Sequence, residues 1–357
     1  MDGIKYCVLA TLLLGSELSA EGSRDTAAIP AAVFARLPQI SEASLSPDGL
    51  QFAALSPFEG KAHLVVHNFD GATKSTVIPP TDELEFDWVQ WANNNRLVFA
   101  MSYFARRDLV ETTETRLLGI DKDGSNIASL VLPATTRQTG SRMPLALPPA
   151  QIQDRVIDWL PDDADHILLA VDSDLDTRSE IRRINVNDGK YDEITSGSSG
   201  IQHWLVDQAG EPRFGYGFRD KDQLFRLRQV DGEWISGNFD EWPYGDFFPI
   251  AFASDPSVAY VRGSNDTGHA VIRELNLSTG EYSDAVFEVD GLDVDSLLLD
   301  PVTGFAAGVS YTEHLPRAYY FDETMALLQR SVDTVLSHTS NSIVSLSADR
   351  NRVFILA

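Results

Sequence analysis

Short runs of alternating apolar and polar residues, separated by turn-forming residues, repeat along this chain. The stretch Ile40 to Ser56, ISEASLSPDGLQFAALS, has two such runs on either side of Pro47-Asp48-Gly49. Proline presets φ at the first central position of a turn, and glycine takes a positive φ at little cost. The stretch therefore predicts a β-hairpin.

Six further stretches have the same layout and begin at Phe86, Val156, Ile201, Phe248, Val294 and Ile343. One turn residue in each hairpin serves as a marker, and successive markers lie 46, 69, 45, 47, 46 and 48 residues apart. The markers are Asp48, Asn94, Asp163, Gln208, Asp255, Pro301 and Asp349. A repeat of this length, made of strands and turns, is typical of β-propellers, in which each repeat is one small antiparallel sheet or blade.

A second hairpin follows the first in most repeats. In the first repeat, Asp70-Gly71 separates two alternating runs, and a glycine stands at the matching turn of the next four repeats. The sixth repeat has a looser copy without glycine, RAYYFDETMALLQRSV. Because two hairpins supply four strands, we expect an all-β fold. The expected architecture is a seven-bladed β-propeller of four-stranded antiparallel blades, the last blade incomplete.

The predicted blades lie near residues 40–80, 86–133, 154–196, 201–239, 248–289, 294–336 and 343–357, the last one partial. The propeller thus spans residues 40–357 and follows a lead-in segment at residues 21–39. The seventh repeat stops after one hairpin, which presents an unpaired apolar edge that proteins normally avoid. Either the N-terminal segment completes this blade or the chain is a fragment of a longer protein, and we favour the fragment.

Two insertions explain why the second interval between turn markers is 69 residues long. Tyr103 to Thr115 extends the loop between the two hairpins of the second repeat, and Pro133 to Gln153 inserts a polar, proline-rich excursion. Long insertions in compact domains are often functional or mobile. We regard the excursion as a candidate lid or contact loop, with a plain surface loop as the alternative.

The first twenty residues have the layout of a secretory signal peptide. Lys5 precedes an apolar run, Tyr6 to Gly15, which is too short to span a bilayer. An N-terminal anchor is the alternative, because Asp2 makes the start of the chain less positive than usual. We therefore expect cleavage after residues 1–20, a periplasmic or secreted protein, and no membrane insertion after cleavage.

Composition excludes some functions. The formal net charge is −25, from 28 basic and 53 acidic residues, and phosphate backbones and anionic lipids need clustered Lys and Arg. We therefore expect no nucleic-acid partner. The only cysteine, Cys7, lies in the signal segment, so the mature chain has neither a disulfide nor a cysteine-based metal site.

Several phrases resemble one known family in order along the chain. They are LSPDGLQFAALS (Leu45 to Ser56), FARLPQISEASLSPDG (Phe34 to Gly49), FDWVQWANNNRLVF (Phe86 to Phe99) and DRVIDWLPDDADHILL (Asp154 to Leu169). The first is similar to repeats of Tol-type propellers and of the prolyl oligopeptidase family of serine peptidases. Together the phrases resemble the N-terminal propeller of bacterial exported members close to the dipeptidyl and acylaminoacyl peptidases.

The resemblance implies a function for the propeller. In that family an α/β-hydrolase domain with a Ser, Asp and His triad follows the propeller, which caps the active site, restricts access to short peptides and orients them. A nucleophile elbow needs G-x-S-x-G. The nearest strings, Gly197-Ser198-Ser199-Gly200 and Gly308-Val309-Ser310-Tyr311-Thr312, do not match it.

We therefore expect no catalytic residue in this chain and no activity from it alone. Its expected partner is a peptide substrate, reached through an associated hydrolase domain that this chain lacks. The alternative is a free-standing periplasmic propeller that acts as a protein-binding scaffold.

The other candidate residues are expected to have structural roles, in packing or in solvated turns, and no catalytic or metal-binding role. His63 and His67 are too far apart on a strand for one zinc ion, and Asp172, Asp174 and Asp176 lack the glycine and glutamate of a calcium loop. We expect no metal-binding and no cofactor-binding residue. Four tryptophans on first hairpins are expected to pack between blades, namely Trp88, Trp91, Trp159 and Trp204.

Overall fold

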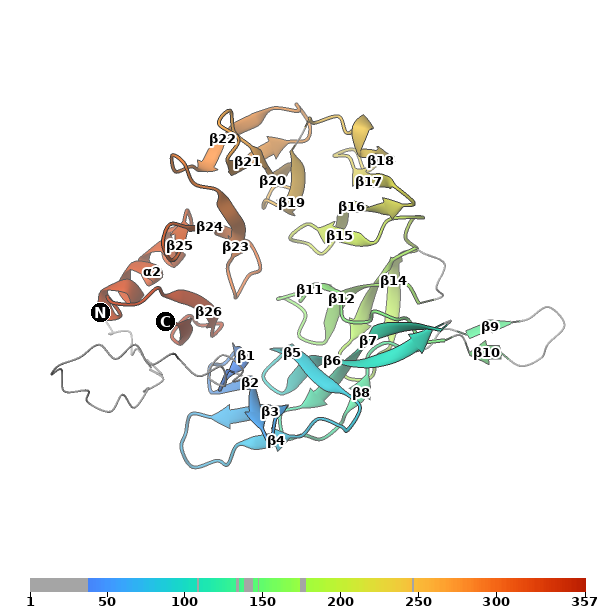
Figure 1. The fold of residues 1–357 in the computed structure, drawn as a ribbon, viewed down its shortest axis with the longest axis vertical. Coiled ribbons are helices and arrows are strands. Elements are labelled where there is room, and N and C mark those ends of the chain that lie inside the picture. Colours follow the sequence, from blue (N-terminus) through green and yellow to red (C-terminus); the bar gives the residue numbers. More distant parts are fainter. Residues whose placement is uncertain are drawn as a thin grey trace, which may run out of the picture.

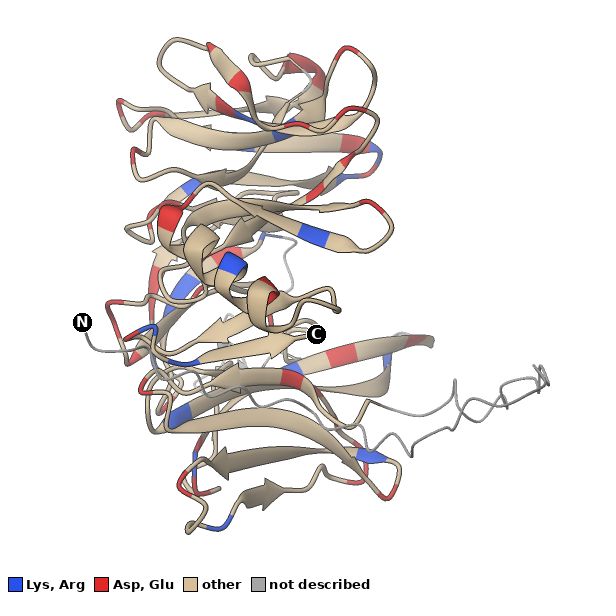
Figure 2. Cartoon of the chain, turned by 90° about the vertical axis from the view of Figure 1, so that its left-hand side faces the viewer, with Lys and Arg blue, Asp and Glu red and all other residues tan. Residues whose placement is uncertain are grey.

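The computed structural model describes residues 38–107, 109–132, 135–137, 144–146, 148–173, 178–245 and 247–357. The predicted signal peptide and most of the lead-in segment therefore lie outside the described residues. The described chain is built from antiparallel sheets that follow one another in sequence order around a common centre (Figure 1). Acidic residues occupy loops on both edges of this ring (Figure 2).

The first three sheets have four strands each, in chain order. The first contains β1 (Ser41–Leu45), β2 (Gln51–Phe58), β3 (Lys61–Asn68) and β4 (Thr76–Ile78). The second contains β5 (Glu85–Trp91), β6 (Arg96–Arg107), β7 (Val110–Asp121) and β8 (Ala128–Ser129). The third contains β11 (Val156–Asp158), β12 (His166–Val171), β13 (Glu180–Asn185) and β14 (Tyr191–Thr195). Between the second and third sheets, a separate ribbon pairs β9 (Thr135–Arg137) with β10 (Pro144–Ala146).

The fourth and fifth sheets also have four strands. The fourth contains β15 (His203–Val206), β16 (Pro212–Arg219), β17 (Asp222–Arg228) and β18 (Trp234–Asn238), followed by the 3-10 helix η1 (Phe239–Glu241). The fifth contains β19 (Phe248–Phe252), β20 (Val258–Ser264), β21 (Ala270–Asn276) and β22 (Tyr282–Phe287). The described part of the sixth contains β23 (Val294–Leu299), β24 (Ala306–Thr312) and β25 (Pro316–Tyr320). The described part of the seventh contains β26 (Ser342–Leu346) and β27 (Val353–Leu356).

The expected fourth strand of the sixth sheet is wrong, because the segment forms the helix α2 (Glu323–Val335). The side chain of Asp322 caps this helix and accepts a hydrogen bond from the Met325 backbone N–H at 2.8 Å. The residues that follow are mostly good helix formers, and no glycine interrupts them. Met325, Gln329 and Val332 recur at helical spacing and are buried, so one face of α2 packs on the sheets.

The expected loop from Tyr103 to Thr115 is also wrong. β6 and β7 stay paired from Arg96 and Asp121 out to Arg107 and Val110, so the extra residues lengthen a hairpin. In the other described sheets, the second and third strands pair over shorter stretches, such as Phe214 to Arg219 of β16 with β17. The second sheet therefore carries a long two-stranded arm.

Each apolar cluster of the core lies between neighbouring sheets. Leu64 and Val66 of the first sheet pack with Leu97 and Phe99 of the second. Comparable clusters fill the spaces between the other consecutive sheets, with Met325 of α2 joining the one between the sixth and seventh sheets. A small sheet cannot bury both faces alone, so this stacking supplies its core.

The first and seventh sheets also pack together. Leu45 and Phe52 of the first sheet share a cluster with Phe354 of β27. The Leu45 backbone N–H donates to the Ser345 hydroxyl at 3.0 Å, and the Ala348 N–H donates to the Pro47 carbonyl at 2.7 Å. We call this contact the seam, because it joins the two ends of the described sheets.

The first strand of each sheet lies nearest the centre (Figure 1). Among the described pairings, each first strand has a register irregularity against the second, for example between Ser41 and Ser44 and between Phe86 and Trp88. Such irregularities bend a strand and increase its twist. The inner strands thus share a distortion that the sequence pattern did not predict.

The expected packing of the tryptophans between sheets is confirmed. The Trp91 indole N–H donates to the Ser44 carbonyl at 3.1 Å, and the Trp204 N–H donates to the Ser179 carbonyl at 2.9 Å. The rings of Trp88 and Trp159 meet edge to face, with centroids 6.1 Å apart. Among the described residues, no helix has the length and apolar character needed to cross a membrane.

Candidate functional site

The candidate residues weighed in the sequence lie apart from one another. Ser198 and Ser199 follow β14, whereas Ser310 lies on β24 with its hydroxyl 2.7 Å from that of Ser296. His63 and His67 lie on β3, where Nδ1 of His63 contacts the Lys61 carbonyl and Nδ1 of His67 contacts the Ser75 hydroxyl. Asp174 and Asp176 lie outside the described residues. No group of three potential metal-ligating side chains occurs in the described part of the chain.

A recess of about 340 Å³ opens where the second, third and fourth sheets meet. Its walls come from the end of β6, the segment before β11, the end of β12 and the residues before β13 and β15. The residues that line it are Arg107, Gln151, Ile152, Arg155, Ala170, Val171, Asp172, Ser179 and Gln202. We call this pocket the arginine recess, because two guanidinium groups line it.

Arg107 is held in place by the arm and by the segment before β11. Its Nε donates to Glu114 Oε1 at 2.6 Å, and its Nη2 donates to the Pro149 carbonyl at 2.7 Å. Glu114 also accepts hydrogen bonds from Arg116 at 2.8 Å and from the Tyr103 hydroxyl at 2.9 Å. The buried carboxylate of Glu114 thus orients one wall of the recess.

The charges in this cluster shift the pKa values of its members. The hydrogen bond from Arg107, helped by Arg116, lowers the pKa of Glu114 to about 2. Burial, together with the hydrogen bond to Glu114, raises the pKa of the Tyr103 hydroxyl. Glu114 therefore stays ionised well below its ordinary pKa of 4.5, and its ion pairs with the neighbouring guanidinium groups are kept there.

Arg155 occupies the opposite wall. Its Nη1 donates to the Gln202 carbonyl at 3.2 Å, which ties the third sheet to the fourth, and its side chain is exposed. The adjacent His203 stacks on Tyr216, with ring centroids 4.8 Å apart. Burial, and secondarily the positive charge of Arg155, lowers the pKa of His203, which favours the neutral imidazole.

The end of the predicted excursion, Pro133 to Gln153, forms part of the recess. The Thr115 backbone N–H donates to the Gln151 carbonyl at 2.9 Å, and the Gln151 side-chain amide donates to the Thr113 carbonyl at 3.1 Å. Residues 133–134, 138–143 and 147 lie outside the described residues, so the predicted lid stays a prediction. Gln151 and Ile152 contribute to one wall of the recess.

The recess is suited to binding hydrogen-bond acceptors. The exposed guanidinium of Arg155 offers paired donors that match carboxylate and carbonyl oxygens, and side-chain amides and a hydroxyl add further polar groups. The carboxylate of Asp172 also lines the recess. The sequence analysis missed this site. Arg155 has no neighbouring basic residue, and Arg106-Arg107 is an isolated basic pair in an acidic chain, so no local pattern connects the two walls.

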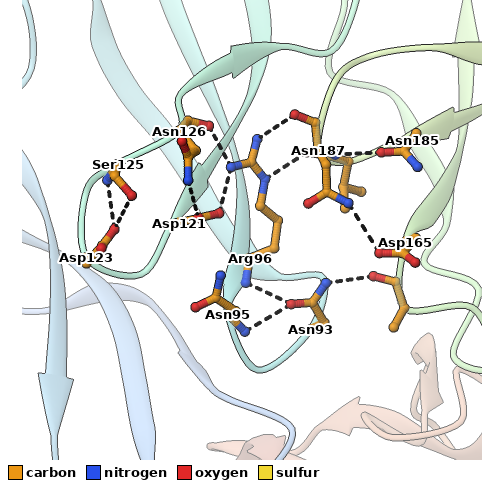
Figure 3. Close-up of polar contacts among 12 residues, drawn as sticks. Asn93, Asn95, Arg96, Asp121, Asp123, Ser125, Asn126, Asp165, Asn185 and Asn187 are labelled. Carbon is orange, nitrogen blue, oxygen red and sulfur yellow. Dashed lines mark hydrogen bonds and ion pairs between the residues drawn. The ribbon is translucent and has the colours of Figure 1, made fainter.

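A second arginine cluster has a structural role. Arg96 is almost completely buried between the second and third sheets (Figure 3). Its guanidinium donates to Asp121 at 2.9 Å, to the Asn126 carbonyl at 2.7 Å and to the Val186 carbonyl at 2.8 Å. These hydrogen bonds hold a buried charge between two sheets.

The chain was compared with known proteins. No protein-family profile matches the sequence, and no curated protein is similar to it at a significant level. Oligogalacturonate lyase from Vibrio parahaemolyticus is a similar solved structure, with 11% identity, a TM-score of 0.43, and coverage of 79% of this chain and 77% of the lyase.

Two further similar structures are an acylaminoacyl peptidase and a TolB protein. The acylaminoacyl peptidase from Pyrococcus horikoshii has 14% identity and a TM-score of 0.39, with 82% of this chain and 47% of the peptidase covered. TolB from Acinetobacter baumannii has 11% identity and a TM-score of 0.39, with 79% of this chain and 61% of TolB covered. The present chain thus spans about half the length of the peptidase.

Proposed function

We propose that this chain is a seven-bladed β-propeller closed at the seam, and that it is the substrate-admitting portion of an exported, prolyl oligopeptidase-like serine peptidase. The catalytic α/β-hydrolase domain would be a separate part of that enzyme. The seven repeated hairpins, the core clusters between consecutive sheets and the hydrogen bonds at the seam support the propeller. The order of family-like phrases from Phe34 to Leu169 supports the family.

The arginine recess is the observation that carries the proposed role. A peptide in extended conformation presents carbonyl oxygens along its backbone and a carboxylate at its end. The exposed guanidinium of Arg155 offers donors to such groups from one wall of the pocket, and the side chains of Gln151 and Gln202 add polar groups to its lining. Holding a peptide in one orientation lowers the entropic part of the barrier for a reaction carried out by another domain.

Calorimetry with the purified chain tests this binding. The probes are acetyl-tetraalanine with a free carboxylate and the same peptide with a C-terminal amide. We expect the carboxylate peptide to bind more tightly, because its charge pairs with a guanidinium. Arg155→Gln should weaken that binding about tenfold or more, since hydrogen bonds to charged groups contribute roughly 1.5–3 kcal/mol.

The matched control is Arg330→Gln, which removes an exposed arginine on α2 far along the chain from the recess. It should leave the peptide affinity unchanged. Equal affinities of the two peptides, or an Arg155→Gln variant that binds like the parent, would contradict a role for the recess. Absence of binding to either peptide would instead favour a free-standing protein scaffold.

The proposal that the catalytic serine lies in a separate hydrolase domain is tested with a fluorophosphonate probe, which forms a covalent bond with an activated serine. We expect no labelled serine in the purified chain, because the proposal places the nucleophile in the hydrolase domain. A labelled peptide identified by mass spectrometry, at Ser198, Ser199 or Ser310 for example, would overturn this part of the proposal while leaving the binding result intact.

A further inference from the structure

The arm formed by β6 and β7 has two different faces. Side chains alternate across a strand, so Tyr103 and Arg107 lie on the face that contacts Glu114 and the segment before β11. The opposite face is exposed and carries Phe104, Arg106, Glu111 and Thr113. Toward the tip of the arm, one face is thus used inside the protein and the other is exposed.

The exposed face and the tip of the arm are unusually apolar for a surface. Phe104 is 90% exposed, and Leu109 and Val110 at the tip are 81% and 62% exposed. Leu109 has a φ of 71°, a conformation that is disfavoured for a bulky residue and that hairpin tips normally assign to Gly, Asn or Asp. A large apolar side chain is therefore presented to solvent where a small polar one would fit the backbone better.

The pairing register makes this face complementary to itself. Arg106 lies opposite Glu111, and Phe104 lies opposite Thr113 on the neighbouring strand. A twofold axis that runs parallel to the strands, between two facing arms, places Arg106 of one molecule over Glu111 of another, and Glu111 over Arg106. Two copies of the face then bring opposite charges together at two equivalent positions.

The charge of the whole molecule restricts where two copies can meet. The net charge is −25, and acidic residues occupy loops on both edges of the ring (Figure 2), so most surfaces of two copies repel each other. The exposed arm face has one positive and one negative side chain beside apolar ones. It is therefore a surface on which association is not opposed by charge.

We propose that the exposed face and tip of this arm bind the same surface of a second copy of the chain, forming a twofold symmetric dimer. Phe104 and Leu109 supply the apolar contact, and Arg106 with Glu111 sets the alignment. The patch is small compared with the roughly 1,200 Å² that stable complexes bury, so the dimer is weak and reversible.

Sedimentation equilibrium of the purified chain over a wide concentration range tests the proposal. We expect the weight-average mass to rise from that of one chain toward that of two. Phe104→Ser combined with Leu109→Gly should shift the dissociation constant at least tenfold toward the monomer. Phe218→Ser, which removes a half-exposed ring from β16, is the matched control and should not change the association.

Variants that swap the charges of Arg106 and Glu111 distinguish this arrangement from non-specific association. Arg106→Glu and Glu111→Arg should each weaken association, because each places like charges together across the twofold axis. The double variant Arg106→Glu/Glu111→Arg should regain association with itself but fail to associate with the parent chain. Circular dichroism and the urea midpoint show whether each variant is folded.

Three outcomes would overturn the proposal. The parent chain could stay monomeric over the whole range, the single charge variants could associate like the parent, or the double variant could stay monomeric while folded. Each outcome excludes self-association through the exposed face of the arm.

Discussion

At the residue scale, one hydrogen bond recurs in each of the seven sheets that carry the repeat. In the turn after the first strand, an Asp or Asn side chain accepts from the backbone N–H two residues later, at 2.8–3.2 Å. The accepting residues are Asp48, Asn93, Asp163, Asp207, Asp255, Asp300 and Asp349. Three predicted turn markers, Asn94, Gln208 and Pro301, are therefore one residue too late.

Arg96 yields a prediction at the same scale. Arg96→Met removes a buried guanidinium and leaves the Val186 and Asn126 carbonyls without their donor. We expect the free energy of unfolding to fall by about 3–5 kcal/mol, as when one partner of a buried ion pair is removed. Urea denaturation followed by tryptophan fluorescence measures it. The exposed Arg330→Met should change stability by less than about 0.5 kcal/mol, and an equal loss in both variants would contradict the bridging role.

Glu114 predicts a dependence of stability on pH. Its pKa in the folded protein is about 2, below the ordinary value of 4.5, so its contribution is complete above about pH 5 and is lost as pH falls from 4.5 toward 2. Glu114→Gln should reduce the free energy of unfolding by roughly 3 kcal/mol at neutral pH. The difference from the parent should shrink on acidification.

Urea titrations at several pH values measure this difference. Glu193→Gln, an exposed residue of β14, is the control and should follow the parent at each pH. A Glu114→Gln effect that is the same at pH 3 and pH 7 would show that lost packing, and not the paired carboxylate, causes the change.

At the element scale, one segment forms a different structure from its counterparts. The fourth strand of a sheet is its outermost one, and in the sixth sheet α2 takes up this part of the repeat. The sequence contains both signals of this helix, an N-cap residue at Asp322 and the helical spacing of Met325, Gln329 and Val332. A hairpin was predicted instead, because the other repeats have a second hairpin at this position.

The cap of α2 can be tested directly. Asp322→Ala removes the acceptor for the Met325 N–H and should lower the free energy of unfolding by about 1 kcal/mol. Asp322→Ser keeps an acceptor at this position and should retain most of the stability. Thermal unfolding of the three proteins gives the comparison, and an Asp322→Ser variant as unstable as Asp322→Ala would argue against capping.

At the scale of the whole molecule, stability depends on contacts between sheets. Each sheet contributes side chains to clusters on two sides, so loss of one contact is expected to affect both neighbours. The seam is of special interest because it joins segments about 300 residues apart, and closing so long a loop has an entropic cost that the seam contacts offset.

Phe354→Ala tests the seam. Loss of the ring, which lies 5.9 Å from that of Phe52, should lower the free energy of unfolding by roughly 2 kcal/mol. Hydrogen exchange should become faster in β26, β27 and β1 and stay unchanged in β16 and β17. Leu356→Ala, an exposed residue of the same strand, is the control. Unchanged protection of β1 would show that the first and last sheets are not coupled.

The candidate site was less predictable than the fold. Repeated hairpins are local, because alternation and turn residues act within a few positions, and the strands and inter-sheet tryptophans follow from them. The arginine recess joins Arg107, Arg155 and Gln202 from three sheets. No local rule brings these residues together, since their proximity depends on how the sheets twist and stack.

The sequence by itself determined the strand content, the spacing of the hairpins and the acidic character of the chain, because these depend on neighbouring residues and on composition. Only the tertiary structure decided that Tyr103 to Thr115 continues as a paired arm, that the first and seventh sheets meet at the seam, and which arginines line a pocket. Pairing partners, register and stacking are set by contacts between distant segments, and the free energy of those contacts is absent from any local stretch of sequence.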